Sequence, residues 1–191
     1  MIIELGHFAL VLALLVSVVQ ALVPMQGTFA RLPSWVALAG PAAIAQLLMV
    51  AIAFGCLAHA YVNSDFSVLN VAQNSHSAKP LIYKITGVWA NHEGSMLLWV
   101  LILAFFGLAI ALFGRNLPPN LRARVLSIQA LIAVGFYIFI LFSSNPFERI
   151  YPVPADGNGM NPLLQDPGVA IHPPFLYLGY VGFSVAFSFA V

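Results

Sequence analysis

Charge is scarce in this sequence of 191 residues: charged residues make up 7% of it, against roughly 25% in a typical soluble domain. Hydrophobic residues make up 61%, and the mean hydropathy is +0.95. Too few polar side chains remain to cover a water-exposed surface, so we expect membrane lipid to be the main solvent. A net charge of +1 also lacks the concentrated basic face that phosphate backbones require, which excludes nucleic acid as a partner.

Cysteine is almost absent as well. Cys56 is the only one, so no intrachain disulfide is possible, and its place in an apolar run predicts a small buried residue. Because no C-x-x-C-H sequence is present, the chain is not itself a c-type cytochrome. The first residues lack the basic segment of a cleavable signal peptide, so we expect the first apolar stretch to remain as a membrane span.

Long apolar stretches without Asp, Glu, Lys or Arg dominate the sequence. A helix crosses the bilayer core with roughly 20 apolar residues, and five stretches approach that length: Leu5–Val23, Pro41–Tyr61, Met96–Phe113, Val125–Phe142 and Pro174–Val191. Lipid offers no partners for unpaired backbone groups. The predicted fold class is therefore all-α, a polytopic membrane helix bundle of about five transmembrane helices with two long outward-facing loops.

The last apolar stretch stops at Val191 without a charged flank. We therefore expect residues 1–191 to form a single membrane domain that is the N-terminal portion of a longer or split protein, with the last helix truncated. Because the stretches carry no Asp, Glu, Lys or Arg, ion-coupled transport is disfavoured. Gln20, Gln46 and Gln129 are their notable polar residues, and such residues more often join helices than bind substrate.

The loops between the stretches differ in charge. Arg31, Arg115, Arg122 and Arg124 fall on one side, whereas all six acidic residues fall on the other. The positive-inside rule places the arginine loops in the cytoplasm. The N-terminus and the two long loops, residues 62–95 and 143–173, then face outward.

Seven prolines lie between residues 143 and 174, in the outward loop that leads into Ile171-His-Pro-Pro-Phe-Leu-Tyr. Proline is favoured in the first turn of a helix, so Pro173 and Pro174 are predicted to open the fifth span with His172 near its N-cap. The positive end of the helix dipole favours a neutral imidazole, whose free lone pair suits a transition metal. A histidine that only caps a helix, or lies at headgroup level, is the alternative.

The other outward loop leads into Gly87-Val-Trp-Ala-Asn-His-Glu-Gly-Ser at the start of the third span. Trp89 could stack against a ligand, and His92 or Glu93 could orient a polar group. A purely structural interpretation explains the same residues, because an acid is favoured in the first turn of a helix and Ser95 can act as a cap. Trp89 and Trp99 also fit an interfacial aromatic belt.

These motifs carry a family resemblance. The stretches that match are Asn63-Ser-Asp-Phe, Val71-Ala-Gln-Asn-Ser, Trp89 through His92-Glu-Gly-Ser to Trp99, Ala123-Arg-Val-Leu-Ser-Ile, Ser144-Asn-Pro-Phe, Asn161-Pro-Leu-Leu-Gln-Asp-Pro-Gly and His172-Pro-Pro-Phe-Leu-Tyr-Leu-Gly-Tyr-Val-Gly. In them the chain resembles the N-terminal part of the CcmF-type haem-lyase subunits of cytochrome c maturation, within the CcmF/CcsA-type haem-handling membrane family.

The resemblance implies a multi-pass protein of the bacterial inner membrane, with its long loops in the periplasm, that presents haem for thioether attachment. The implied cofactor is haem b. The implied partners are a periplasmic haem chaperone, and apocytochrome c with its thiol-handling and chaperone subunits. His172 matches the family's first periplasmic haem-ligand histidine, whereas the equivalents of Trp89, His92 and Glu93 form a recurrent motif with no catalytic role assigned.

The sequence also departs from the family pattern. It lacks the tryptophan-rich periplasmic motif, the second periplasmic histidine and the two transmembrane histidines, so we expect the remaining helices to come from the rest of the protein or from a partner chain. Two other functions stay open: a non-catalytic scaffold that docks the chaperone and the apocytochrome-handling proteins, and a haem-transfer channel. The channel is disfavoured because the spans hold no ligand at membrane depth.

Overall fold

The computed structural model describes residues 1–191, except for the side chain of Val169. Five of its helices are long and apolar enough to cross a membrane, as predicted: α1 (Ile2–Ala30), α3 (Ala39–Val62), which continues the short α2 (Pro33–Ala37), α6 (His92–Phe113), α7 (Pro119–Ser143) and α8 (Pro167–Ala190). The short elements are α4 (Leu69–Asn74), α5 (Leu81–Gly87), and the 3₁₀ turns η1 (Gly114–Asn116) and η2 (Pro162–Leu164). Over the residues so described, no strand forms beyond an isolated bridge between Val68 and Arg149. The predicted all-α membrane bundle is confirmed.

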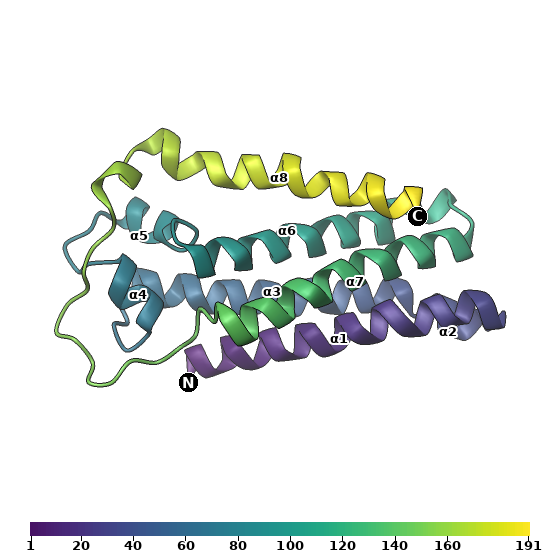
Figure 1. The fold of residues 1–191 in the computed structure, drawn as a ribbon, viewed down its shortest axis with the longest axis horizontal. Coiled ribbons are helices and arrows are strands. Elements are labelled where there is room, and N and C mark those ends of the chain that lie inside the picture. The colour runs from purple at the N-terminus through teal and green to yellow at the C-terminus, as the bar shows by residue number, and fades with distance from the viewer.

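Helices α1, α3, α6 and α7 form the core of the bundle, and α8 lies along α6 on one side of it (Figure 1). The core is made of small and aliphatic side chains with two fully buried tyrosines, Tyr61 and Tyr137. Cys56 is buried and unpaired, as predicted. Close packing explains Gly6, because a Cβ at this position would lie 2.8 Å from the Cβ of Cys56.

The three membrane glutamines join helices, as predicted. Gln20 donates to the carbonyl of Leu126, and Gln46 donates to the hydroxyl of Tyr137, both at 3.2 Å. Gln129 donates to the hydroxyls of Ser184 and Ser188 and so ties α7 to α8. In lipid, such bonds stabilise a helix pair by about 0.6 kcal/mol each on average.

Helix α1 extends further than its sequence suggested, because it continues through Pro24 to Ala30. Proline has no N–H, so Pro24 cannot donate to the carbonyl of Gln20 four residues earlier. The hydroxyl of Ser127 on α7 donates to that oxygen instead, at 3.1 Å. A neighbouring helix therefore satisfies the carbonyl that the proline leaves free.

The bundle has two unlike ends (Figure 1). We call the end with residues 63–91 and 144–166 the loop end; the N-terminus lies there too. We call the end with α2 and η1 the arginine end, which carries Arg31, Arg115, Arg122 and Arg124.

The two segments at the loop end form one folded layer. Their backbones bond directly: the amides of Leu69 and Asn158 donate to the carbonyls of Glu148 and Ala72, each at 2.8 Å. Asp156 accepts from the amide of Ser77 at 2.9 Å and also bonds its hydroxyl. The two outward loops are thus one cap built from both segments.

Two predicted helix starts are wrong. Helix α8 begins at Pro167 and not at Pro173, so His172 lies in its second turn and is not the N-cap. Asp166 accepts from the amide of Gly168 at 2.8 Å and precedes a proline, which are the ordinary features of a helix start. Helix α6 is capped by Asn91, which accepts from the amide of Gly94, and not by Ser95.

Candidate functional site

His172 lies on the side of α8 that faces away from the core. The buried residues of this helix, among those described, are Ala170, Val181 and Ser188, whose spacing of 11 and then 7 residues puts them on one face. His172 follows Ala170 by two residues, about 200° around the helix axis. Its side chain is exposed accordingly.

The outward face around His172 is apolar and aromatic. Phe175, Leu176 and Phe183 follow it at helical spacing and are all exposed, Phe183 by 74%. Gly179 lies between them, and a Cβ there would meet nothing within 4 Å. Within the described side chains, none hydrogen-bonds the His172 ring. The face therefore presents one imidazole beside exposed apolar side chains.

The number of metal-ligating side chains near His172 limits which metal groups this face can bind. Among the described residues, no group of three or more His, Cys, Asp or Glu side chains is placed to hold a metal ion. A metal on His172 would therefore have to arrive with most of its ligands. Haem would fit that condition, because its porphyrin supplies most of the ligands of the iron and a histidine such as His172 would hold it.

A hydrogen bond from Trp89 fixes the turn that carries His172. Pro174 has no N–H to donate to the carbonyl of Ala170, four residues before it. The indole Nε1 of Trp89 donates to this oxygen at 2.8 Å. The same arrangement occurs at Pro24, where the hydroxyl of Ser127 on α7 donates to the carbonyl that lacks its helical N–H.

Trp89 is itself held in place. It precedes α6, is half-buried, and stacks on Phe54 of α3 with ring centroids 6.5 Å apart. It packs against the hydrophobic core of the bundle. Trp89 therefore connects the core to the second turn of α8, which was not evident from its interpretation as a stacking platform or belt residue.

Glu93 belongs to a different cluster, a buried polar network at the start of α6. Asn70 of α4 donates to Glu93 at 3.0 Å and to Asn91 at 2.8 Å. The hydroxyl of Tyr61 donates to Asn70 at 2.6 Å and accepts from Asn91 at 2.9 Å. Tyr61 and Asn70 are buried. Glu93 is thus the end of a network that joins α3, α4 and α6.

Gly94 follows this network, and steric crowding explains why this position is a glycine. A Cβ at this position would lie 1.6 Å from the carbonyl oxygen of Val88. No side chain can occupy that space unless the turn from Val88 to Asn91 moves. The His-Glu-Gly order thus keeps the α6 cap closed.

His92 and Glu93 are not brought together with His172. The His92 ring bonds the hydroxyl of Ser144 at 3.1 Å and packs edge-on against Phe139, both in or next to α7. Of the predicted site residues, Trp89 alone makes a described hydrogen bond to α8. The sequence did not point to Asn70, Tyr61 or Ala170. It did offer a signal for Asn91, because an Asn directly before a helical stretch is a candidate N-cap.

Comparison with known proteins gives one consistent picture. A family model described as cytochrome C assembly protein matches residues 89–191. The chain is 62% identical over its whole length to the cytochrome c-type biogenesis protein ccl1 of Rhodobacter capsulatus and 52% identical to the cytochrome c-type biogenesis protein CcmF of Pseudomonas aeruginosa. It covers 29% of each of these proteins.

A solved structure shows the same arrangement. The structure titled Cytochrome c Heme Lyase CcmF matches all of this chain with a TM-score of 0.87 and 27% sequence identity, and the match covers 30% of that structure. The chain therefore spans less than a third of the length of the relatives and the structure that it matches. Its five-span fold is one part of a larger architecture in those proteins.

Proposed function

Because the chain belongs to the cytochrome c assembly protein family, we propose that it forms part of a cytochrome c haem lyase, in which His172 is an axial ligand to the iron of haem b. The observation that carries the proposal is the unbonded imidazole of His172 on an exposed aromatic face of α8. Relatives named as biogenesis proteins, and a structure titled as a haem lyase, support the same function.

His172 would hold the iron, and the exposed side chains of Phe175, Leu176 and Phe183 would cover part of the apolar ring face. When bound, the cofactor supplies the vinyl groups that are joined to the cysteine thiols of the apocytochrome. The protein contributes orientation and electrostatics. The described residues would supply one ligand to the iron and one side of the haem site. The other sides would come from the larger architecture of the relatives or from a partner chain.

Trp89 is a positioning residue in this proposal. Its bond to the carbonyl of Ala170 fixes the backbone two residues before His172. Without it, that carbonyl would be an unpaired group in an apolar setting, and the turn would have reason to shift. Glu93 and His92 act further away, by closing the α6 cap and joining it to α4 and α7.

The proposal includes a location and partners. The protein lies in the inner membrane of a bacterium, with the arginine end in the cytoplasm and the loop end in the periplasm. The loop end would then meet a periplasmic haem chaperone and the apocytochrome with its thiol-handling subunits. Its two segments, folded into one layer, provide a shaped surface for such partners.

The test is maturation of c-type cytochromes in a bacterial strain whose own copy of this protein is replaced by variants. His172→Ala is expected to abolish most covalently bound haem in the cytochromes, measured by haem staining. His59→Ala is the matched control, because His59 is also an exposed histidine at the loop end and its ring makes no described bond. Normal maturation with His172→Ala, at normal protein levels, would overturn the ligand role and favour the scaffold function.

A further inference from the structure

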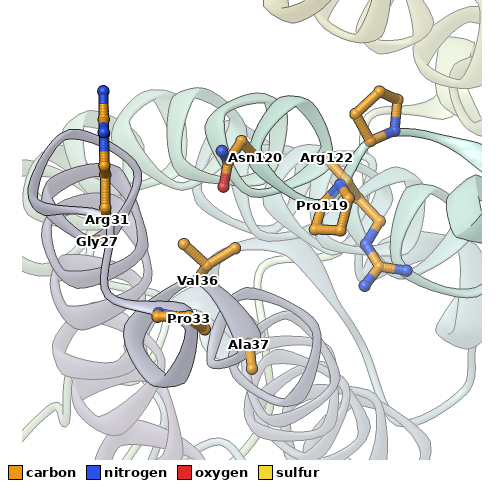
Figure 2. Close-up of a pocket in the computed structure, with 9 residues that line it drawn as sticks. Gly27, Arg31, Pro33, Val36, Ala37, Pro119, Asn120 and Arg122 are labelled. Atoms are coloured by element: carbon orange, nitrogen blue, oxygen red, sulfur yellow. The ribbon is translucent and has the colours of Figure 1, made fainter.

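A pocket of about 450 Å³ lies at the arginine end, far from His172. It is formed between the end of α1, the short helix α2 and the start of α7 (Figure 2). Its volume falls within the usual range of small-molecule sites, roughly 300–1,000 Å³. Nothing in the proposed lyase function uses this pocket.

Two arginines from distant parts of the sequence line the pocket. Figure 2 shows Arg31 and Arg122 on either side of it, with Val36 and Pro33 between them. Over the described residues, neither arginine makes an ion pair. At the loop end the situation differs, because Arg149 lies against both Glu4 and Asp65.

The lack of ion pairs follows from the sequence. Residues 24–40 and 114–124 contain four arginines and no acidic residue. Among the described residues, no Asp or Glu side chain lies at the arginine end, so the two arginines have no side-chain counter-charge there. An anion from outside the chain would supply it.

Apart from the two arginines and Asn120, the lining of the pocket is apolar. Val36, Ala37, Pro33, Pro118 and Pro119 contribute to its lining beside the two arginines. A fully hydrated small anion gains nothing from such a wall. A molecule with an anionic head attached to an apolar body would gain from both parts of the pocket.

The pocket is built into the turn between two spans. Arg31 ends α1 in the left-handed conformation (φ 56°), and the amide of Leu32 donates back to Gly27 at 2.9 Å. Gly27 is required by the close approach of α2, because a Cβ there would lie 2.7 Å from the Cβ of Trp35. The pocket is therefore preformed by backbone packing.

Its place at the ends of two spans corresponds to the depth of the lipid headgroups. It lies where one span ends and the next begins, and the neighbouring Trp35 is 41% exposed, as is typical of an interfacial tryptophan. From the cavity, the two unpaired arginines, the apolar lining and this depth, we infer that the pocket binds the headgroup of an anionic phospholipid of the arginine-side leaflet. Basic pockets between membrane helices on the cytoplasmic side bind such headgroups in other proteins.

The test is native mass spectrometry on the protein purified from membranes in mild detergent, together with the chains that accompany it. Phosphatidylglycerol and phosphatidylcholine are titrated separately. The inference predicts tighter binding of phosphatidylglycerol, weakened by about fivefold in Arg31→Gln and again in Arg122→Gln, the amount expected for one surface arginine each. Arg31→Lys, which keeps the charge, is expected to retain most of the preference.

Arg115→Gln is the matched control, since Arg115 lies at the same end and does not line the pocket. It is expected to leave the affinity for phosphatidylglycerol within about twofold of the original. An equal loss in Arg115→Gln would show a diffuse surface field and overturn the site. So would equal binding of the two lipids. Displacement of phosphatidylglycerol by inorganic phosphate, at constant ionic strength, would assign the pocket to a free anion and contradict the lipid.

Discussion

The rest of the chain buries the four core helices far more than it buries α8. In the most hydrophobic window of each span, 33% to 44% of the residues are buried for the first four spans, but 11% for the last. The core helices pack on each other, whereas α8 touches only one side of the bundle. The helix that carries His172 is thus the one that this chain covers least.

What holds α8 also differs from what holds the core. The core is close-packed around aliphatic side chains such as Leu57 and Leu103. Helix α8 buries few side chains, such as Val181, and polar contacts hold it at both ends: Gln129 bonds Ser184 and Ser188 near its far end, and Trp89 bonds the carbonyl of Ala170 near its start. Such directed bonds fix the rotation of a helix without covering its outer face. This arrangement leaves an imidazole and an aromatic wall open to a large ligand.

The largest expected effect is on the free energy of unfolding, which should fall when a core side chain is truncated but not when an exposed side chain of α8 is truncated. Leu57→Ala removes a fully buried side chain and should lower the free energy of unfolding by about 2–5 kcal/mol. Phe183→Ala, at an exposed position of α8, should change it by less than about 0.5 kcal/mol. Reversible unfolding in detergent micelles measures both. Comparable losses would mean that α8 packs as tightly as the core.

A second test removes the polar network that closes the start of α6. Asn70→Leu removes the side-chain oxygen that accepts from Tyr61 and the amide that donates to Glu93 and Asn91, at a cost of about 1–3 kcal/mol. Asn63→Leu is the control, because Asn63 is exposed and bonds only a backbone carbonyl of its own helix end. The same unfolding assay applies. Equal effects of the two substitutions would show that the network adds nothing to stability.

The attachment of α8 at Trp89 can be tested with a double-mutant cycle. Trp89→Phe removes the N–H but keeps an aromatic ring against Phe54, and should cost about 1 kcal/mol. Pro174→Ala restores an N–H that can donate to the carbonyl of Ala170 within the helix. In the Pro174→Ala background, Trp89→Phe should therefore cost much less, measured by unfolding.

A cycle without coupling would mean that Trp89 only packs. The haem spectrum provides a second readout. Trp89→Phe should broaden or shift the signal of bound haem, and Pro174→Ala should restore it. Coupling in stability with an unchanged spectrum would leave Trp89 as a structural residue and contradict its positioning role.

The smallest expected effect concerns the layer at the loop end. Bonds from Ser77 lower the pKa of Asp156 to about 2 in the folded protein, from an ordinary value near 3.8. A depressed pKa means that the stabilisation is complete above about pH 4 and is lost as the pH falls towards 2. Asp156→Asn should therefore lower the melting midpoint slightly at pH 7 and have a much smaller effect at pH 2. An equal difference at pH 7 and pH 2 would contradict this cause.

The sequence was sufficient for the five spans, since apolar runs without charge have few alternatives to membrane helices. The roles of Gln20, Gln46 and Gln129 were also predictable, because amides in lipid must find partners. The helix ends near prolines were not. Pro24, Pro173 and Pro174 look like helix boundaries, but partners far along the chain, Ser127 and Trp89, supply the donors that two of them remove. Those contacts exist only in the folded bundle.

The site was predictable in part. The paired prolines drew attention to His172, and the structure places its ring on an open face of α8. Helical periodicity could not place Trp89 beside Ala170, because the two residues are 81 positions apart. It also could not separate Glu93 from the site, since the partner of Glu93 is Asn70 of a short helix with no signal of its own.

The most direct test of the account is the absorption and resonance Raman spectrum of the protein, purified with its accompanying chains and loaded with haem by the chaperone. The expected signal is that of low-spin haem with histidine ligation. It should be lost in His172→Ala and retained in His59→Ala, with the assembly intact in both. An unchanged spectrum in His172→Ala would show that this residue does not ligate the iron, and would contradict the proposal that α8 presents the haem.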